Sequence, residues 1–191
     1  MNIERGSVWR KWDFHVHTPY SILNNNYGVN PYEEQWNEAQ FDAYVVALFT
    51  KAVENGVAAI GITDYFSIDG YRHIQNSYIR NEEKMVQLFP DDELRSKVYQ
   101  ILLLPNIEMR TDNFVGKGAH AVNYHVIFSN TLSPEDIEEC FLNSLQFPYQ
   151  AGKTLPLTRR NIERLGAEYK ASNGGTGSDY RIGLERVTVS Y

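Results

Sequence analysis

The chain has 191 residues, 42% of them hydrophobic and 13% aromatic, which is enough apolar material for one domain with its own core. The single cysteine, Cys140, excludes an internal disulfide and a thiolate zinc cluster. The formal net charge is −6, from 24 acidic and 18 basic side chains, and no stretch gathers Lys or Arg into a stripe that would follow a phosphate backbone.

The sequence shows neither a membrane span nor a signal peptide. No apolar run approaches the length of a span, and residues 1–12 lack the hydrophobic segment of a signal peptide. We therefore expect one cytoplasmic domain over residues 1–191, without a membrane partner.

The most informative stretch is Trp-Asp-Phe-His-Val-His-Thr, residues 12–18. Alternate residues of a strand point to the same face, so we expect Asp13, His15 and His17 on one face and the two apolar residues between them on the other. A lone histidine in such a strand is more often a satisfied core residue. A His-x-His pair that runs into a polar loop instead favours a metal site.

The next part of the chain predicts a βαβ unit. Residues 19–30, rich in Asn, Tyr and Gly, predict a long loop. Pro31 to Gly56 then predicts an amphipathic helix, with proline near its start and glycine as its stop. Val57 to Thr63 predicts a buried strand that ends at Asp64. Strands joined in this way are expected to be parallel.

The second half predicts further strands and helices. The expected elements are a polar helix over 71–88, a buried strand over 98–104 that leads to Glu108, a loop over 111–119, a strand over 122–128, helices from Ser133 and over 159–171, a Gly/Ser loop over 172–178 and a strand over 186–191. The interval from Glu108 to His125 is too short for a crossover helix, which predicts a hairpin or an irregular loop. The chain is expected to end before its fold does.

Three further residues are candidate ligands. Asp64 ends a buried strand, where α/β folds place their sites, although it could equally be a turn cap. Glu108 follows an apolar run and needs a partner, either a metal or Arg110. His125 lies in a strand setting like that of the first pair. The three histidines at strand ends, His15, His17 and His125, together with Glu108 suit zinc, manganese or iron.

The two remaining histidines are weaker candidates. His120 lies an odd number of residues from His125, so in a continuous strand the two would face opposite ways. His73 falls in a polar helix and is most simply a surface residue.

The order of these pieces resembles a known family. His15-x-His17-Thr18, Gly61-Ile62-Thr63-Asp64, Ile107-Glu108 and His125 are similar to the first motifs of the polymerase-and-histidinol-phosphatase (PHP) superfamily. The longer strings around them resemble the amino-terminal domains of TrlF-type PHP–ATPase proteins, over roughly residues 9–130. The resemblance implies a distorted (β/α)7 barrel, here incomplete at its carboxyl end. It also implies a two- or three-metal centre at the strand ends and phosphoester hydrolysis.

The resemblance also implies roles for single residues. His15 and His17 would hold one metal, Glu108 would bridge two, and His125 would hold another. The chain departs from the family at Tyr65, where a histidine is usual, at Asn24, where many members have aspartate, and after residue 125, where no further histidine occurs. The first two departures weaken the same metal position, so we expect the metal at His15 and His17 to bind most tightly.

The expected activity is metal-dependent hydrolysis of a phosphoester, in a phosphorylated small molecule or a nucleic acid, by a metal-activated water. Asp64 would orient a ligand or transfer a proton, and Arg110 or Lys117 would pair with the phosphate. Tyr65 and Asn24 would then line the substrate side of the weakened position.

The alternative is a PHP-like module of little or no activity that binds a nucleotide or a partner, or supports an ATPase domain or subunit. The chain has no Gly-x-x-x-x-Gly-Lys-Ser/Thr loop, so ATP hydrolysis is not expected in it.

Overall fold

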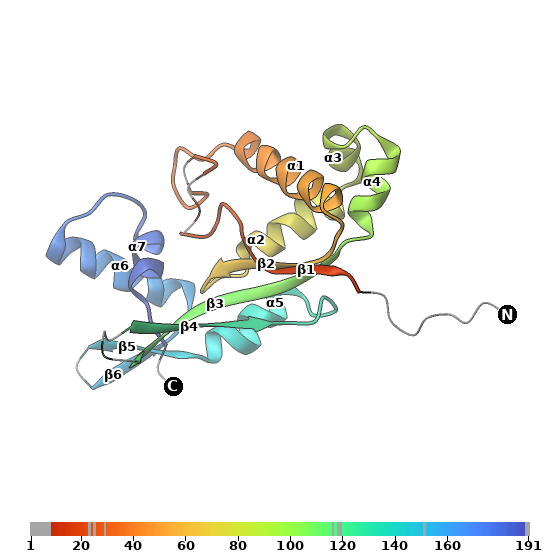
Figure 1. Ribbon diagram of the computed structural model, residues 1–191. Helices are drawn as coiled ribbons and strands as arrows, with labels where there is room; N and C mark the ends of the chain where they lie inside the picture. Colours follow the sequence, from red (N-terminus) through yellow and green to blue (C-terminus); the bar gives the residue numbers. More distant parts are fainter. Residues whose placement is uncertain are drawn as a thin grey trace.

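The structure is a computed structural model that describes residues 9–22, 24, 26–28, 30–115, 117, 120–150 and 152–189 (Figure 1). Within these residues six strands form a four-stranded sheet and a separate two-stranded hairpin. None of the described helices is both long and apolar enough to cross a membrane.

The main sheet has its strands in chain order. β1 (Lys11–His17), β2 (Val57–Tyr65) and β3 (Leu102–Val115) are parallel, and β4 (His120–Ile127) runs antiparallel to β3. The predicted βαβ unit and the predicted antiparallel return after Glu108 are both confirmed. The sheet curls like half of a barrel.

Helix α1 (Glu38–Glu54) covers one face of this sheet (Figure 1). It starts later than predicted, because residues 31–35 form turns and Asn37 and Gln40 make a capping box at the helix start. The side chains of Phe41, Val45 and Phe49 are fully buried, at the helical spacing that the sequence predicted.

The helix predicted over residues 71–88 is divided. Its parts are α2 (Asp69–His73), the π-helical segment η1 (Ile74–Ile79) and α3 (Glu82–Leu88), and α4 (Asp92–Tyr99) follows. Asn81 interrupts the predicted helix because its side chain caps α3, where it accepts a hydrogen bond from the backbone N–H of Lys84. Asp91 caps α4 in the same way, by accepting from the backbone N–H of Leu94. The strand predicted from residue 98 therefore begins only at residue 102.

The chain after β4 forms short elements in succession. These are α5 (Pro134–Asp136), η2 (Ile137–Phe141), η3 (Leu142–Ser144), β5 (Gln146–Gln150), β6 (Lys153–Pro156), α6 (Arg159–Asn173) and α7 (Asp179–Arg186). The predicted strand over 186–191 is wrong in its described part, because the chain is helical up to residue 186 and only Val189 pairs, in a bridge with Thr111.

The (β/α)7 barrel that the resemblance implied is wrong. Only three strands of the described sheet are parallel, and β4 reverses direction because the connection from β3 is too short for a crossover helix. The residues after β4 build helical turns and the separate β5–β6 hairpin rather than further strand–helix units. The fold is a mixed α/β structure with a four-stranded, half-barrel sheet.

Candidate metal centre

Glu108 is at the centre of the candidate site. In the sheet it stands directly opposite Tyr65 on β2 and His125 on β4, while His17 at the end of β1 stands opposite Thr63. Because β1, β2 and β3 are parallel, the side chains at their carboxyl ends meet at one edge. The sheet thus brings together the four residues that the sequence proposed as ligands: His15, His17, Glu108 and His125.

A β-bulge in β1 sets the direction of the first two histidines. Asp13 pairs with Ile60 and Val16 with Ile62, so the two residues Phe14 and His15 stand against Gly61 alone. The prediction that Asp13, His15 and His17 share one face of the strand is therefore wrong for Asp13. Asp13 and Val16 lie under helix α1, where both line a pocket, and the two imidazoles lie together on the other face.

The bulge is held by side chains from the neighbouring strands. The backbone oxygen of Phe14 accepts hydrogen bonds from Nδ2 of Asn106, at 2.6 Å, and from the hydroxyl of Thr63, at 3.3 Å. A Cβ on Gly61 would lie 2.5 Å from the same oxygen. The glycine is therefore required for β1 to approach β2 this closely.

Three ligand atoms converge beyond the bulge. Nε2 of His15 and Nε2 of His17 are 3.0 Å apart, and they lie 3.3 and 3.2 Å from Oε2 of Glu108. Ligands about 2 Å from a tetrahedral ion are separated by roughly 3.3 Å, so these spacings match three ligands of one ion. The Glu108 side chain is 5% exposed and that of His15 is 52% exposed, which places the group at the surface with its carboxylate below.

The lowered pKa values of two of the imidazoles favour metal binding. Burial lowers the pKa of His17, and the nearby His15 and His125 lower it further against the opposing effect of Glu108. Burial and His15 likewise lower the pKa of His125. Neutral imidazole is the form that binds metals.

A second ligand combination includes His125. One ligand atom from each of His15, Glu108 and His125 lies within 4.8 Å of the other two, and the rings of His15 and His125 are 4.3 Å apart. Nδ1 of His125 lies 3.1 Å from Nδ2 of Asn106, so the buried amide that anchors the bulge also orients this ring. His15, Glu108 and His125 therefore form a second possible set of ligands, which shares two residues with the first.

A chain of hydrogen bonds leads from the carboxylate to an arginine. Oε1 of Glu108 accepts from Asn123 at 2.8 Å, and Asn123 accepts from the hydroxyl of Tyr65 at 3.3 Å. That hydroxyl accepts from Nε of Arg110 at 3.0 Å, and the guanidinium lies 5.3 Å from the ring centre. Tyr65 and Arg110, both candidates from the sequence, are thus connected to Glu108 through Asn123.

Asp64 lies outside the cluster of ligand atoms. It is 1% exposed and accepts hydrogen bonds from the hydroxyl of Thr18, at 2.7 Å, and from the backbone N–H of Gly70, at 2.8 Å. Burial raises the pKa of Asp64 to about 7, against the effect of these two hydrogen bonds. A Cβ on Gly70 would lie 2.2 Å from Oδ2 of Asp64 and 2.2 Å from the hydroxyl oxygen of Thr18, so this position also requires glycine. Asp64 positions the residue that follows His17.

The remaining two candidates lie at the periphery. Nδ2 of Asn24 donates to the backbone oxygen of His17 at 3.1 Å, and its Oδ1 accepts from the backbone of Asn26. The amide of Asn24 therefore braces the end of β1. Lys117 is exposed in the turn between β3 and β4, and of its neighbours 116, 118 and 119 nothing is described.

No family model, curated protein or solved structure matches the chain. The assignment of a function therefore rests on the site itself. The sequence analysis gave no role to Asn106 or Asn123, and it named Thr18 only as part of a motif; all three contact the proposed residues. A usable signal existed for two of them, because Asn106 and Asn123 precede Glu108 and His125 by two residues and so share their faces.

Proposed function

We propose that the chain is a metal-dependent phosphoesterase related to the PHP superfamily, with His15, His17 and Glu108 holding the principal divalent ion. The observation that carries the proposal is the convergence of their three ligand atoms within 3.0–3.3 Å. Two imidazoles and one carboxylate are the ligand set of many catalytic zinc sites, in which a further position stays open for water. Manganese and iron accept the same ligands.

The surrounding residues fit a second, weaker position. His125 would hold this ion together with His15 or Glu108, which lie within its reach. A bound divalent ion supplies a Lewis acid and a water that is acidic enough to attack a phosphoester near neutral pH. Oε1 of Glu108 is fixed by Asn123, so the carboxylate presents Oε2 to the imidazoles in one orientation.

The substrate side of the proposal rests on Arg110. Its Nε–H donates to the hydroxyl of Tyr65, which holds the guanidinium in place, and the Nη groups would bind phosphoryl oxygens. Asp64 acts as a positioning residue, because it holds Thr18 at the end of β1.

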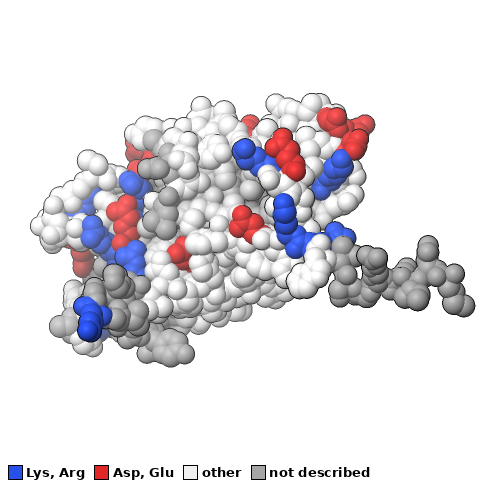
Figure 2. Space-filling view, viewed as in Figure 1, with Lys and Arg blue, Asp and Glu red and all other residues white. Residues whose placement is uncertain are grey.

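The phosphoester would be part of a small molecule or a short nucleic acid. On the face shown in Figure 2, basic and acidic side chains are interspersed, which does not favour a long tract of nucleic acid on that face. A small phosphorylated metabolite or an oligonucleotide end fits this charge distribution better.

One set of contacts favours the alternative, a PHP-like module that binds a ligand or supports an ATPase partner without turnover. Tyr65 and Asn24 both use their polar groups within the protein, Tyr65 with Arg110 and Asn24 with the backbone of His17. Neither is free to complete the third metal position of the family.

The experiment is to purify the chain without chelator, to measure zinc, manganese and iron per chain, and to assay p-nitrophenyl phosphate, bis-p-nitrophenyl phosphate and short oligonucleotides with added manganese. We expect at least one metal per chain and hydrolysis of one of these esters. His17→Ala should remove most of the metal and the activity, because it removes a ligand from the converging group. The control is His73→Ala, since His73 lies away from the candidate ligands, where its half-buried side chain bonds Glu38 and Ser77.

Two outcomes would contradict the proposal. Less than one metal per chain with no turnover would favour the binding module. Retention of full metal content in His17→Ala, with loss in His73→Ala, would place the metal elsewhere.

A further inference from the structure

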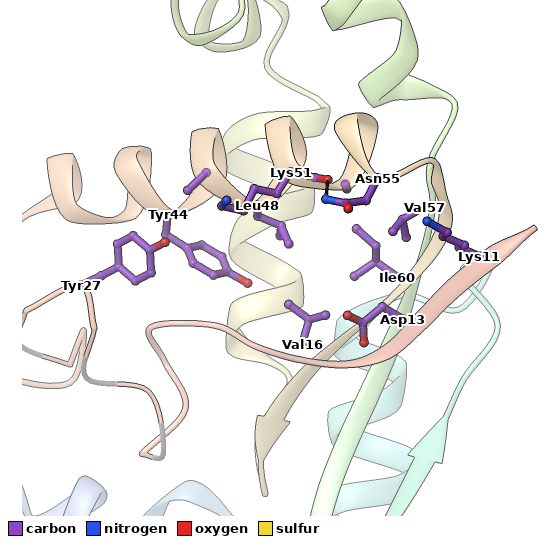
Figure 3. A pocket seen from close by; sticks show the side chains of 12 residues that line it. Lys11, Asp13, Val16, Tyr27, Tyr44, Leu48, Lys51, Asn55, Val57 and Ile60 are labelled. Carbon is purple, nitrogen blue, oxygen red and sulfur yellow. Dashed lines mark hydrogen bonds between the residues drawn. The ribbon is translucent and has the colours of Figure 1, made fainter.

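A second site lies on the opposite face of β1, beneath helix α1. A cavity of about 470 Å³ opens there between the helix and the first two strands (Figure 3). None of the four candidate metal ligands is among its lining residues. Its volume lies within the range of pockets that hold small organic ligands.

The walls of this cavity are mainly apolar. The apolar part is contributed by both elements: Val16, Ala47, Leu48, Ala52, Val57 and Ile60. Transfer of an alkyl or aryl group from water onto these side chains is favourable. The cavity therefore suits a ligand with an apolar body.

One buried polar group points into the cavity without a partner. The side chain of Tyr44 is 4% exposed, its hydroxyl is buried, and within the described residues that hydroxyl makes no hydrogen bond. Figure 3 shows the hydroxyl directed into the space between α1 and β1. Burial raises the pKa of Tyr44 well above its usual value, so the group stays protonated and available as a donor. A buried hydroxyl without a partner is costly, and a ligand that accepts from it would remove this cost.

The rim of the cavity is positively charged. Lys11 on β1 and Lys51 on α1 stand on opposite walls, both exposed. Neither forms an ion pair with another described residue. The third charged lining residue, Asp13, has one carboxylate oxygen 3.3 Å from the backbone nitrogen of His15, from which it accepts. The formal charges of Lys11, Lys51 and Asp13 sum to +1, and this net positive charge attracts an anionic head group.

We propose that this cavity is a binding site for a small amphipathic anion: an alkyl or aryl group that fills the apolar walls, with a carboxylate or similar acidic head that pairs with Lys51 and accepts from Tyr44. The site is separate from the proposed metal centre and does not depend on its activity.

The test is a comparison of three ligands with the same chain and different heads, namely decanoate, decanol and decylamine, each below its micelle concentration. Binding is measured by calorimetry and by the shifts of backbone amide signals in the NMR spectrum. We expect saturable binding of decanoate, with shifts confined to α1, β1 and β2. Decanol and decylamine should bind at least tenfold more weakly.

Variants locate the ligand. Tyr44→Phe should weaken decanoate binding roughly fivefold, the effect of one hydrogen bond, while the unliganded protein keeps or gains thermal stability. Lys51→Gln should weaken binding by a similar factor, whereas Lys153→Gln, on β6, should not. Ala47→Phe should block the cavity, and Ala43→Phe, at an exposed position of the same helix outside the lining, should not.

Equal affinity for decanoate and decylamine would contradict the proposal that the ligand has an anionic head group. Decanoate shifts away from α1 and β1, or an unchanged affinity in Ala47→Phe that is folded by circular dichroism, would overturn the site. No saturable binding of any of the three ligands would overturn the whole proposal.

Discussion

The side-chain nitrogen of Asn106 lies 2.6 Å from the backbone oxygen of Phe14, two strands away in the sheet, and 3.1 Å from Nδ1 of His125. Asn106 is 1% exposed, so these bonds form away from water. One amide thus fixes both the bulge that carries His15 and the ring of His125, although Asn106 is not itself among the proposed ligands.

Asn106→Ala is expected to lower the free energy of unfolding by about 1–3 kcal/mol, because the bulged carbonyl would lose its nearest donor. It should also weaken metal binding several-fold, since His15 and His125 would lose their common support. Urea unfolding of the metal-free protein and a metal titration measure the two effects. Asn173→Ala, which removes an exposed side-chain bond to the backbone of Tyr169, is the matched control. Equal effects of the two variants would contradict this role.

Gly61→Ala should destabilise the protein by about 1–3 kcal/mol or more, because the added methyl would lie 2.5 Å from the oxygen of Phe14 and the strands would have to separate. The midpoint of thermal unfolding should fall, and metal affinity should fall with it as His15 moves. An unchanged midpoint with native metal affinity would show that β1 and β2 do not approach each other in this way.

Tyr65→Phe removes the hydroxyl that joins Arg110 to Asn123. We expect a loss of about 1 kcal/mol in stability and a several-fold loss in the rate of phosphoester hydrolysis, because the guanidinium and the Glu108 carboxylate both lose orientation. Unfolding and steady-state kinetics measure these effects. The corresponding change at the exposed Tyr99 should have neither effect. A fully active Tyr65→Phe enzyme would remove Arg110 from the proposed mechanism.

Asp64 should make stability depend on pH. Its pKa is raised from 3.8 to about 7 in the folded protein, so protonation favours folding. The contribution is complete below about pH 4, decreases as the pH rises and is lost above about pH 7. The shift corresponds to at most roughly 4 kcal/mol, at about 1.4 kcal/mol per pKa unit.

Asp64→Asn tests this effect, because the amide resembles the protonated acid: it can donate to Thr18 and accept from Gly70. Relative to the wild type, the variant should gain stability as the pH rises from 5 to 8, measured by urea unfolding at each pH. Asp92→Asn, at an exposed carboxylate, is the control. A constant difference between Asp64→Asn and the wild type over this range would show that the acid is ionised throughout.

The local pattern of the sequence predicted the elements whose own residues determine them. The helix before Gly56, the buried strand that ends near Asp64 and the antiparallel return after Glu108 follow from periodicity, turn residues and connection length. The proposed ligands were likewise visible as residue types at strand ends, and the sheet brings them together.

The features that the sequence did not predict depend on residues far apart in the chain. The bulge in β1 requires Gly61 on β2 and Asn106 on β3. The face of β1 on which Asp13 lies could therefore not be predicted from the alternation of side chains along the strand. The β5–β6 hairpin is short and contains Pro148, which weakens a strand signal. Helix α7 was missed because it has only eight residues and contains Gly183, which weakens a helix signal.

The bulge in β1 has a consequence for self-association. Among the described strands β1 is at an edge of the sheet, where a regular strand would offer its N–H and C=O groups to another molecule. The extra residue at Phe14 and His15 breaks the repeat of these groups, and Asn106 and Thr63 hold the oxygen of Phe14 within the protein. The same irregularity that aims the histidines therefore makes this edge a poor template for intermolecular strand pairing and aggregation.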